Sequence, residues 1–210
     1  MNGFISCSNN IKTLLETVVC SSILHSKWLN TLSYLENCGA RKIAQCEHPT
    51  LVKEEVLKHA AEEFRHAHYL KRQIKRVSLE SMQTYSLCNM LGGIASLNYL
   101  NELDVQTSRY LTSQGFTKAE IKEKAYLLVT YAIELRASEL YPIYDEILRK
   151  NRSPVTVKSI LLEEKEHLKE MEERLLQIPH GFSYAEKVCA IEGELCVNWL
   201  QAVIKSISNN

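Results

Sequence analysis

Aspartate, glycine and proline are scarce in this chain of 210 residues. Only Asp104 and Asp145 among its 25 acidic residues are aspartate, and the chain has 7 glycines and 4 prolines. Aspartate competes with the backbone for hydrogen bonds and favours caps and turns, whereas the abundant glutamate costs little inside a helix. So few turn-forming residues argue against a β-sandwich, a β-barrel or a disordered tail. The composition therefore predicts an all-α protein.

Net charge and cysteine pairs are also missing. The 25 basic residues balance the 25 acidic ones, which leaves no basic surface for nucleic acid or an anionic membrane. The cysteines are odd in number and form no CxxC pair, which predicts reduced, mostly buried thiols rather than disulfides or a zinc site. They are Cys7, Cys20, Cys38, Cys46, Cys88, Cys189 and Cys196.

The chain has no clear targeting or membrane segment. Its first residues carry no basic stretch ahead of an apolar run, so we expect no secretory signal. The uncharged stretch 81–101 is long enough to span a bilayer, but polar residues interrupt it, and we expect a buried core helix instead. With the cysteine pattern, this predicts a cytoplasmic protein with no membrane partner and no nucleic-acid partner.

Capping signals divide the chain into six helical segments. We expect helices at 10–46 (an interruption near 21–26 is left open), 50–77, 83–113, 117–150, 154–177 and 183–206. The signals are the capping boxes Thr117–Glu120 and Ser183–Glu186, the pair Ser153–Pro154 at a helix start, Gly115 and Gly181 at helix ends, and the break His48–Pro49–Thr50. No linker divides the chain, so we expect one domain over 1–210.

The order of these segments predicts their topology. Short loops around 47–50 and 150–153 each close a helical hairpin, and the segment 83–113 lies between the two hairpins. A helix of that length runs about 45 Å, enough to cross the whole bundle. The expected fold is a four-helix bundle over about 24–177 in which 50–77 and 117–150 run parallel, with the final helix packed outside.

Polar residues occupy the expected core stripe of two helices. In 50–77 the apolar seam is interrupted by His59, Glu63 and His66, and in 154–177 it is interrupted by Glu164 and His167. Residues three apart share a helix face, so each Glu-x-x-His pair can present a carboxylate oxygen and an imidazole nitrogen to one point. Two such pairs are unremarkable in a Glu-rich chain, but their place on core stripes is informative.

The helix before each pair carries an inward-facing glutamate of its own. Glu36 precedes Glu63 by 27 residues, and Glu134 precedes Glu164 by 30. In an antiparallel hairpin with a central loop, these spacings bring both carboxylates to a similar depth. Four unpaired buried carboxylates would be very costly, whereas two divalent cations would balance them. Carboxylates with imidazoles suit iron or manganese better than structural zinc.

These motifs resemble the ferritin-like di-iron carboxylate superfamily. Its pattern of Glu, Glu-x-x-His, Glu and Glu-x-x-His on four helices is similar to Glu36 in SYLENCG, Glu63 and His66 in EEFRH, Glu134 in AIELR, and Glu164 and His167 in EEKEH. The resemblance implies a ferritin-like bundle that holds two Fe ions, with Mn as an alternative. It also implies that Glu36 and Glu134 bind one metal each, that Glu63 and Glu164 bridge, and that His66 and His167 are terminal ligands.

Two positions are open to a second interpretation. Glu139 competes with Glu134, and we prefer Glu134 because Thr130, Ala137 and Ser138 leave room for metals. His59 is expected to be a hydrogen-bonded core residue near the metals rather than a ligand. His25, His48, His68 and His180 are expected at the surface or in loops, Tyr131 and Tyr141 in the core, and most of the glutamates from 163 to 173 on a solvated face.

The hairpin spacings and the helical crossover are closest to those of aldehyde-deformylating oxygenases. This similarity implies the superfamily only. Our leading hypothesis is a di-iron oxygenase or oxidase that uses dioxygen to oxidise a small organic substrate; an electron donor and a homodimer are possible further partners. A ferroxidase or iron-binding protein would use the same six ligands, and a metal-free helical scaffold would bury protonated glutamates. The sequence does not identify the substrate.

Overall fold

The computed structural model describes residues 3–47, 50–79 and 82–208, and helices are the only regular secondary structure in these ranges. The all-α prediction is confirmed. The elements are α1 (Ser8–Val19), α2 (Ser22–Gln45), α3 (Glu54–Ile74), the short 3₁₀ helix η1 (Leu87–Asn89), α4 (Ile94–Ser113), α5 (Lys118–Lys150), α6 (Lys158–Leu176) and α7 (Gly181–Ser208).

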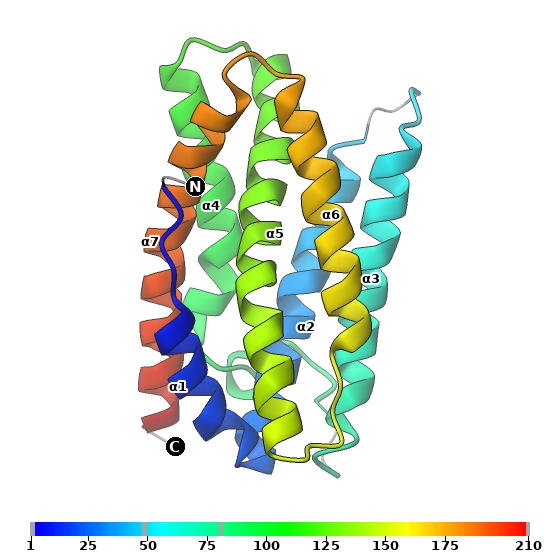
Figure 1. Cartoon of the computed structure of the whole chain (residues 1–210), viewed down its shortest axis with the longest axis vertical. Helices are drawn as coiled ribbons and strands as arrows, with labels where there is room; N and C mark the ends of the chain where they lie inside the picture. Colours follow the sequence, from blue (N-terminus) through cyan, green and yellow to red (C-terminus); the bar gives the residue numbers. More distant parts are fainter. Residues whose placement is uncertain (1–2, 48–49, 80–81, 209–210) are drawn as a thin grey trace.

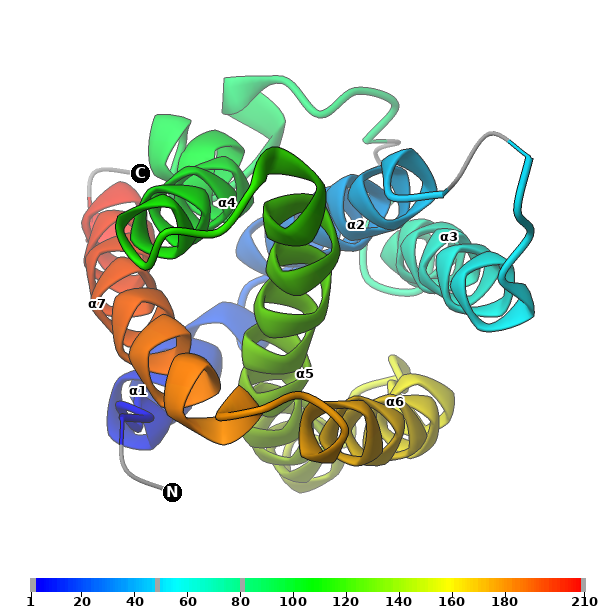
Figure 2. The ribbon, with the colours of Figure 1, turned by 90° about the horizontal axis from the view of Figure 1, so that it is seen from above.

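The longest helix, α5, lies at the centre of the molecule. Seen from above, α2, α3 and α6 lie on one side of it and α1, α4 and α7 on the other (Figure 2). The tightest helix pairings are α2 with α3 and α5 with α6, as expected for the two hairpins. In Figure 1, α3 and α5 both run downwards while α2 and α6 run upwards. The hairpins α2–α3 and α5–α6 therefore lie on one side of the molecule, with α1, α4 and α7 beyond α5.

The first expected helix is interrupted, as the sequence left open. Ser21 has an extended backbone, and its side-chain oxygen accepts a hydrogen bond from the amide of Leu24, which caps the start of α2. The break at 48–49 predicted from His48 and Pro49 lies outside the described residues.

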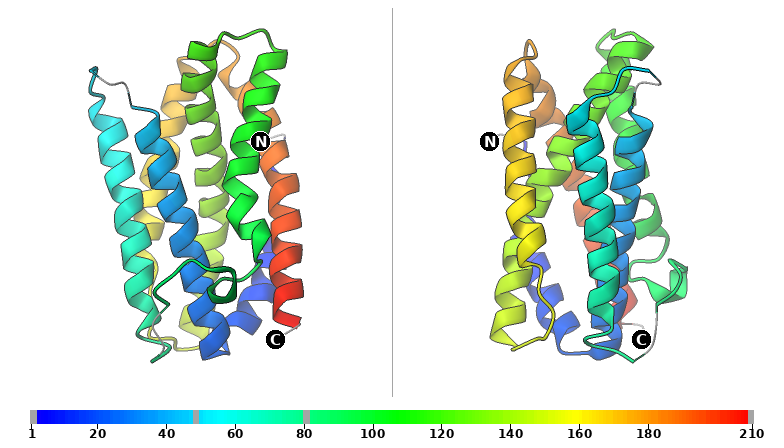
Figure 3. Two further views of the ribbon diagram at one scale, coloured as in Figure 1. Left: turned by 180° about the vertical axis from the view of Figure 1, so that it is seen from behind. Right: turned by 90° about the vertical axis from the view of Figure 1, so that its right-hand side faces the viewer.

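The expected helix 83–113 is wrong in its first third. Helix α4 begins only at Ile94, after Gly92 and Gly93, which both have a positive φ. The preceding segment runs across the outer side of α2 (Figure 3). Asn30 donates hydrogen bonds to the carbonyls of Thr84 and Asn89 there. This one side chain of α2 satisfies two carbonyl groups that a helix would otherwise have paired. The described part of the uncharged stretch, 82–101, is thus only partly helical.

Two expected helix starts are also wrong. Helix α6 begins at Lys158 rather than at Pro154, because Val155 and Val157 are buried as part of an irregular segment and Arg76 donates to the carbonyl of Pro154. The Ser183–Glu186 capping box is absent because α7 already begins at Gly181.

The predicted helix ends behave differently from each other. Gly115 ends α4 as predicted, with a φ of 84°. Gly181 does not end a helix; its φ is not positive, and His180 takes the left-handed conformation instead. A Cβ at Gly181 would lie 2.3 Å from the carbonyl oxygen of Leu175, so glycine is needed there for close approach of the backbone. The capping box of Thr117 and Glu120 forms as predicted at the start of α5.

The apolar core fills both sides of α5. Trp28 of α2 and Trp199 of α7 stack with ring centroids 5.8 Å apart, and Tyr144 of α5 packs edge-on against Trp28. These fully or almost fully buried rings fix α7 against the rest of the protein. No helix among the described residues is long and apolar enough to cross a membrane.

The cysteines are less buried than the sequence suggests. All seven are free thiols, as expected. Only Cys7, Cys189 and Cys196 are buried, whereas Cys20 and Cys88 are exposed and the other two are intermediate.

Candidate metal centre

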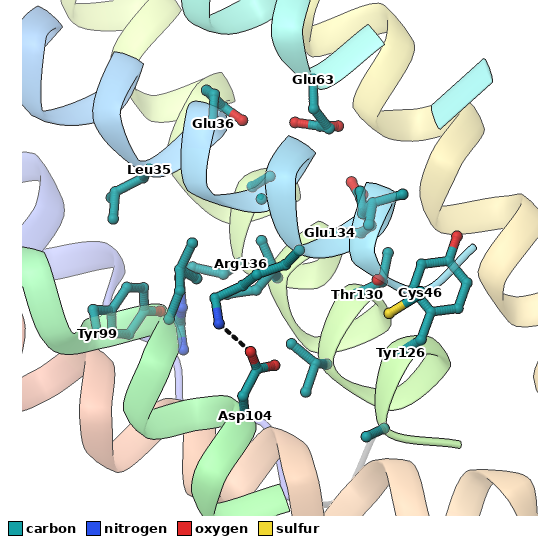
Figure 4. Close-up of a pocket in the computed structure, with 18 of the residues that line it drawn as sticks. Leu35, Glu36, Cys46, Glu63, Tyr99, Asp104, Tyr126, Thr130, Glu134 and Arg136 are labelled. Carbon is teal, nitrogen blue, oxygen red and sulfur yellow. Dashed lines mark hydrogen bonds and ion pairs between the residues drawn. The ribbon is translucent and has the colours of Figure 1, made fainter. Parts of the chain in front are cut away.

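The six predicted ligands come together in the interior between α2, α3, α5 and α6. Five of them are almost fully buried, with exposed fractions from 1 to 5 %: Glu63, His66, Glu134, Glu164 and His167. Glu36, the sixth, is half-buried and lines a cavity beside the others. Figure 4 shows Glu36, Glu63 and Glu134 approaching one another from three different helices. Each helix thus supplies the residues that its polar interruption predicted.

The residues form two groups whose potential ligand atoms lie within 4.8 Å of one another. The first group is His59, Glu63, Glu134 and His167, and the second group is Glu36, Glu63, His66 and Glu164. Only Glu63 belongs to both groups. Each group contains carboxylate oxygen and imidazole nitrogen, and could hold one metal ion.

The two oxygens of Glu63 face different groups. Its Oε1 lies 3.3 Å from His59 Nε2 and 3.5 Å from His167 Nδ1, while its Oε2 lies 3.7 Å from His66 Nδ1. This arrangement suits a carboxylate that bridges two ions with one oxygen on each. Glu164 was predicted to be the second bridge; it belongs to the second group and its carboxylate also contacts Glu134 of the first group, so its bridging role stays a prediction.

Two glutamates outside the groups orient the histidines across the α3–α6 interface. The Nε2–H of His66 donates to Glu163 at 2.7 Å, and the Nε2–H of His167 donates to Glu62 at 2.9 Å. Each glutamate therefore holds the histidine of the opposite helix and directs its Nδ1 lone pair inward. Carboxylate–histidine pairs of this kind fix the tautomer and raise the basicity of a metal ligand.

This outer pair was missed in the sequence, where Glu163 was assigned to a solvated face. The signal was the doublets Glu62–Glu63 and Glu163–Glu164, each followed by a histidine. Arg65 reaches Glu163 at 2.5 Å. Burial opposes the ionisation of Glu163, but the hydrogen bonds from His66 and Arg65 outweigh it and lower its pKa.

The carboxylates of the centre repel one another. Burial, followed by the charges of its carboxylate neighbours, raises the pKa of Glu36, and burial likewise raises the pKa of Glu134 and Glu164 well above the usual range. Glu63 behaves oppositely, because its contacts with His59 and His66 outweigh burial and lower its pKa. Burial disfavours the charged form of His66, but Glu164 and Glu63 outweigh it and raise its pKa to about 12. Protons must therefore screen the negative charge when no metal does.

Buried side-chain atoms that lack a hydrogen-bond partner indicate whether a metal ion would fit the centre. Buried atoms without a hydrogen-bond partner within the described protein include Glu63 Oε1, Glu134 Oε2, Glu164 Oε1 and the Nδ1 atoms of His66 and His167. His66 Nδ1 lies 3.1 Å from Glu164 Oε1, so two lone pairs face each other unless a proton or a cation lies between them. Buried polar atoms are normally satisfied. This donor set fits divalent iron or manganese.

Glu134, rather than its competitor Glu139, lies in the centre. Glu139 points to the N-terminal segment, where it accepts hydrogen bonds from the backbone amide of Cys7 at 3.0 Å and from Ser8 Oγ at 2.7 Å. It also pairs with Arg136. These contacts account for both of its oxygens, so nothing is left for a metal.

The remaining histidines and tyrosines divide between surface and core. His68 and His180 are exposed as expected, and His48 lies outside the described residues. His25 was expected at the surface but is 1 % exposed, because it hydrogen-bonds Tyr144 Oη at 2.7 Å inside the core. Tyr131 is a fully buried core residue, as predicted. The buried hydroxyl of Tyr141 donates to Glu36 Oε1, which makes it an outer partner of the centre.

A cavity of about 370 Å³ adjoins the centre between α2, α4 and α5. Its wall is mostly apolar, with Leu32, Leu35, Val129 and Ile133 among its residues, and it reaches Glu36, Glu63, Glu134 and Glu164. Figure 4 shows this wall, with the dashed line marking the ion pair of Asp104 with Lys42. Arg136 also lines it, but its charge is paired with buried Glu192 at 2.7 Å.

Comparisons with known proteins give no relative. No protein-family model matches the chain, and no curated protein or solved structure matches it.

Proposed function

We propose that this protein is a ferritin-like di-iron enzyme that activates dioxygen and oxidises a small apolar organic molecule. One observation carries the proposal: the four carboxylates that would hold the metals, three of them buried and Glu36 half-buried, also line the apolar cavity. A substrate in that cavity would lie directly against the centre. A cavity of about 370 Å³ is in the usual range for small-molecule sites.

The arrangement of the helices supports the ferritin-like assignment. The pairs α2–α3 and α5–α6 are joined through α4, and α3 and α5 run in the same direction (Figure 1). Such a connection is the mark of a bundle with one long crossover. The crossover is a helix over only part of its length, because α4 begins at Ile94. The likeness to aldehyde-deformylating oxygenases is therefore weaker here than the sequence predicted.

The chain's own residues would supply positioning, charge balance and a dry site. Bound iron would supply coordination positions for dioxygen and would pass on to it the electrons that an external donor provides. Glu63 would hold both ions together through its two oxygens, and Glu62 and Glu163 would fix the two histidines. The hydroxyl of Tyr141 would hold Glu36 in place, and the apolar walls would keep water from the reacting molecules.

The overall reaction requires a source of electrons. For an organic substrate R–H, insertion of one oxygen atom into the C–H bond follows R–H + O₂ + 2 e⁻ + 2 H⁺ → R–OH + H₂O. Two electrons per turnover must come from an external donor, and we include an electron-transfer protein or a small reductant among the partners. Manganese remains an alternative metal because the ligand types suit it as well.

Iron loading and oxygen uptake test the proposal. Metal-free protein given Fe(II) without oxygen should hold two ions per chain by elemental analysis, and exposure to air should produce a charge-transfer absorption band with consumption of oxygen. The double variant Glu63→Ala/Glu164→Ala should lose metal and band together. The matched control is Glu166→Ala on the exposed face of α6, which should retain both.

Other outcomes identify the competing functions. A folded protein that binds no iron would contradict the proposal and favour a helical scaffold, and the double variant would then be at least as stable as the wild type. Iron uptake into a large hollow assembly, seen by size-exclusion chromatography, would favour storage. A monomer or dimer that consumes oxygen supports the enzyme.

A further inference from the structure

His59 lies inside the centre, although it belongs to no Glu-x-x-His pair. It is one turn before Glu63 on α3 and is 2 % exposed. Its Nε2 lies 3.0 Å from Glu134 Oε1 and 3.3 Å from Glu63 Oε1. Its ring centroid is 4.3 Å from that of His167. The same nitrogen therefore faces both carboxylates of the first group.

The surroundings of His59 differ from those of the other two histidines. His66 and His167 each use Nε2 to bond an outer glutamate and present Nδ1 to the centre. His59 presents Nε2 to the centre, and its buried Nδ1 has no hydrogen-bond partner within the described protein. The observation that assigns His59 to the centre is the position of Nε2, which faces two carboxylates of the first group as a ligand atom would.

We propose that His59 is a metal ligand, which makes the two metal positions chemically unequal. One position takes His59, His167, Glu134 and one oxygen of Glu63. The other takes Glu36, His66, Glu164 and the second oxygen of Glu63. This proposal rests on the dinuclear centre of the proposed function, and it adds a third imidazole to the six expected ligands.

The inequality has a chemical consequence. The position with two imidazoles carries less negative charge than the position with two carboxylates of its own and one imidazole. Imidazole favours later first-row ions such as Co²⁺ and Zn²⁺, while carboxylate suits Mn²⁺. Metal-free protein given one equivalent of Co²⁺ and then excess Mn²⁺ should therefore hold one ion of each kind per chain.

Counting the coordinated imidazoles tests the assignment. In protein fully loaded with Co²⁺, each coordinated histidine gives one exchangeable N–H proton signal that the paramagnetic ion shifts far outside the normal NMR range. The wild type should give three such signals and the variant His59→Gln two. Added imidazole should restore a third signal in the smaller variant His59→Ala, because the vacated space admits a replacement ligand. The matched control is His68→Ala on the exposed face of the same helix, which should retain three.

The outcomes separate this inference from the proposed function. Two bound Co²⁺ ions with only two shifted signals in the wild type, unchanged in His59→Gln, would overturn the role of His59 and leave the dinuclear centre standing. Failure of the folded wild type to bind Co²⁺ would overturn both. Circular dichroism of each metal-free variant shows whether the helices are intact, and His59→Gln keeps a polar side chain in the space if His59→Ala does not fold.

Discussion

At the residue scale, the centre depends on which nitrogen or oxygen atom faces inward. His66 and His167 both present Nδ1 to the centre because Nε2 of each bonds an outer carboxylate of the opposite helix. Glu63 divides its oxygens between two groups. Single substitutions that alter these orientations should change metal binding without removing a ligand.

The outer carboxylates should tune metal affinity. Glu62→Gln and Glu163→Gln keep the shape of the side chain but replace the negative charge that accepts from the histidine. We expect each to weaken metal binding by about 10- to 100-fold, the range found for such partners. Competition with a coloured chelator measures the affinity. The exposed Glu166→Gln is the control, and equal affinities in all three variants would show that the outer pair has no effect.

Glu134 and Glu139 should separate metal binding from stability. Glu134→Ala should lose metal because it removes a carboxylate from the first group. Glu139→Ala should retain full metal content but lower the free energy of unfolding by about 1–3 kcal/mol, because Arg136 and the amide of Cys7 lose a buried partner. Elemental analysis and urea denaturation measure the two effects. Loss of metal in Glu139→Ala alone would reverse the assignment.

At the scale of the helices, two glycines differ in their surroundings: one lies where two stretches of backbone pack closely, and the other lies beside open space. Gly181 approaches the backbone of Leu175, while a Cβ at Gly39, in the last third of α2, would meet no atom within 4 Å apart from its own helix. Gly39 has this space because it lines the cavity. The same residue type therefore has opposite roles in α7 and α2.

Alanine at these two positions should have opposite effects on stability. Gly39→Ala should raise the free energy of unfolding by about 0.5–1 kcal/mol, because alanine favours a helix interior. Gly181→Ala should lower it by about 1–3 kcal/mol, because the added Cβ forces the chain away from Leu175. Thermal and urea unfolding measure both. Destabilisation by Gly39→Ala would contradict the open space beside α2.

At the scale of the whole molecule, the bundle concentrates negative charge at its centre although the chain is neutral. Without metal, the pKa values of Glu36, Glu134 and Glu164 lie above those of the unfolded chain. The native state then binds more protons than the unfolded state at pH values above the ordinary glutamate range. The contribution of these three groups to the free energy of unfolding is therefore complete at pH values below that range, and it is lost as the pH rises through the raised pKa values.

Metal-free and metal-loaded protein should therefore respond to pH in opposite ways. The melting temperature of the metal-free protein should fall between about pH 6.5 and pH 8, because the raised pKa of His66 acts in the same direction there, while the lowered pKa of buried His25, about 4, opposes the fall only below this interval. Metal displaces these protons, so the stabilisation by metal should grow over the same interval and vanish in acid. Differential scanning calorimetry with and without Fe(II) or Mn(II) measures both curves. A metal-free melting temperature that rises over this interval would contradict the buried charge cluster.

The sequence by itself determined the helical class and the inward-facing residues. Glu36, Glu63, His66, Glu134, Glu164 and His167 interrupt apolar stripes, and periodicity places a residue on a helix face without any knowledge of the neighbouring helices. The capping box at Thr117 was also readable, because all of its partners lie within one turn. Helix starts that depend on distant contacts could not be predicted from the sequence. Helix α4 starts late because a side chain of α2 binds the preceding backbone, and α6 starts late because Val155 and Val157 are buried in an irregular segment.

Only the tertiary structure decided how the helices meet. The crossed pairs of Glu62 and Glu163 and the inward turn of His59 depend on atoms of different helices. The cavity does too, because its wall is shared by α2, α4 and α5. Periodicity fixes a side chain's direction around its own helix but not its depth, its rotamer or the group across the interface. Those quantities follow from packing, and in this protein packing turns scattered polar positions into one candidate metal centre.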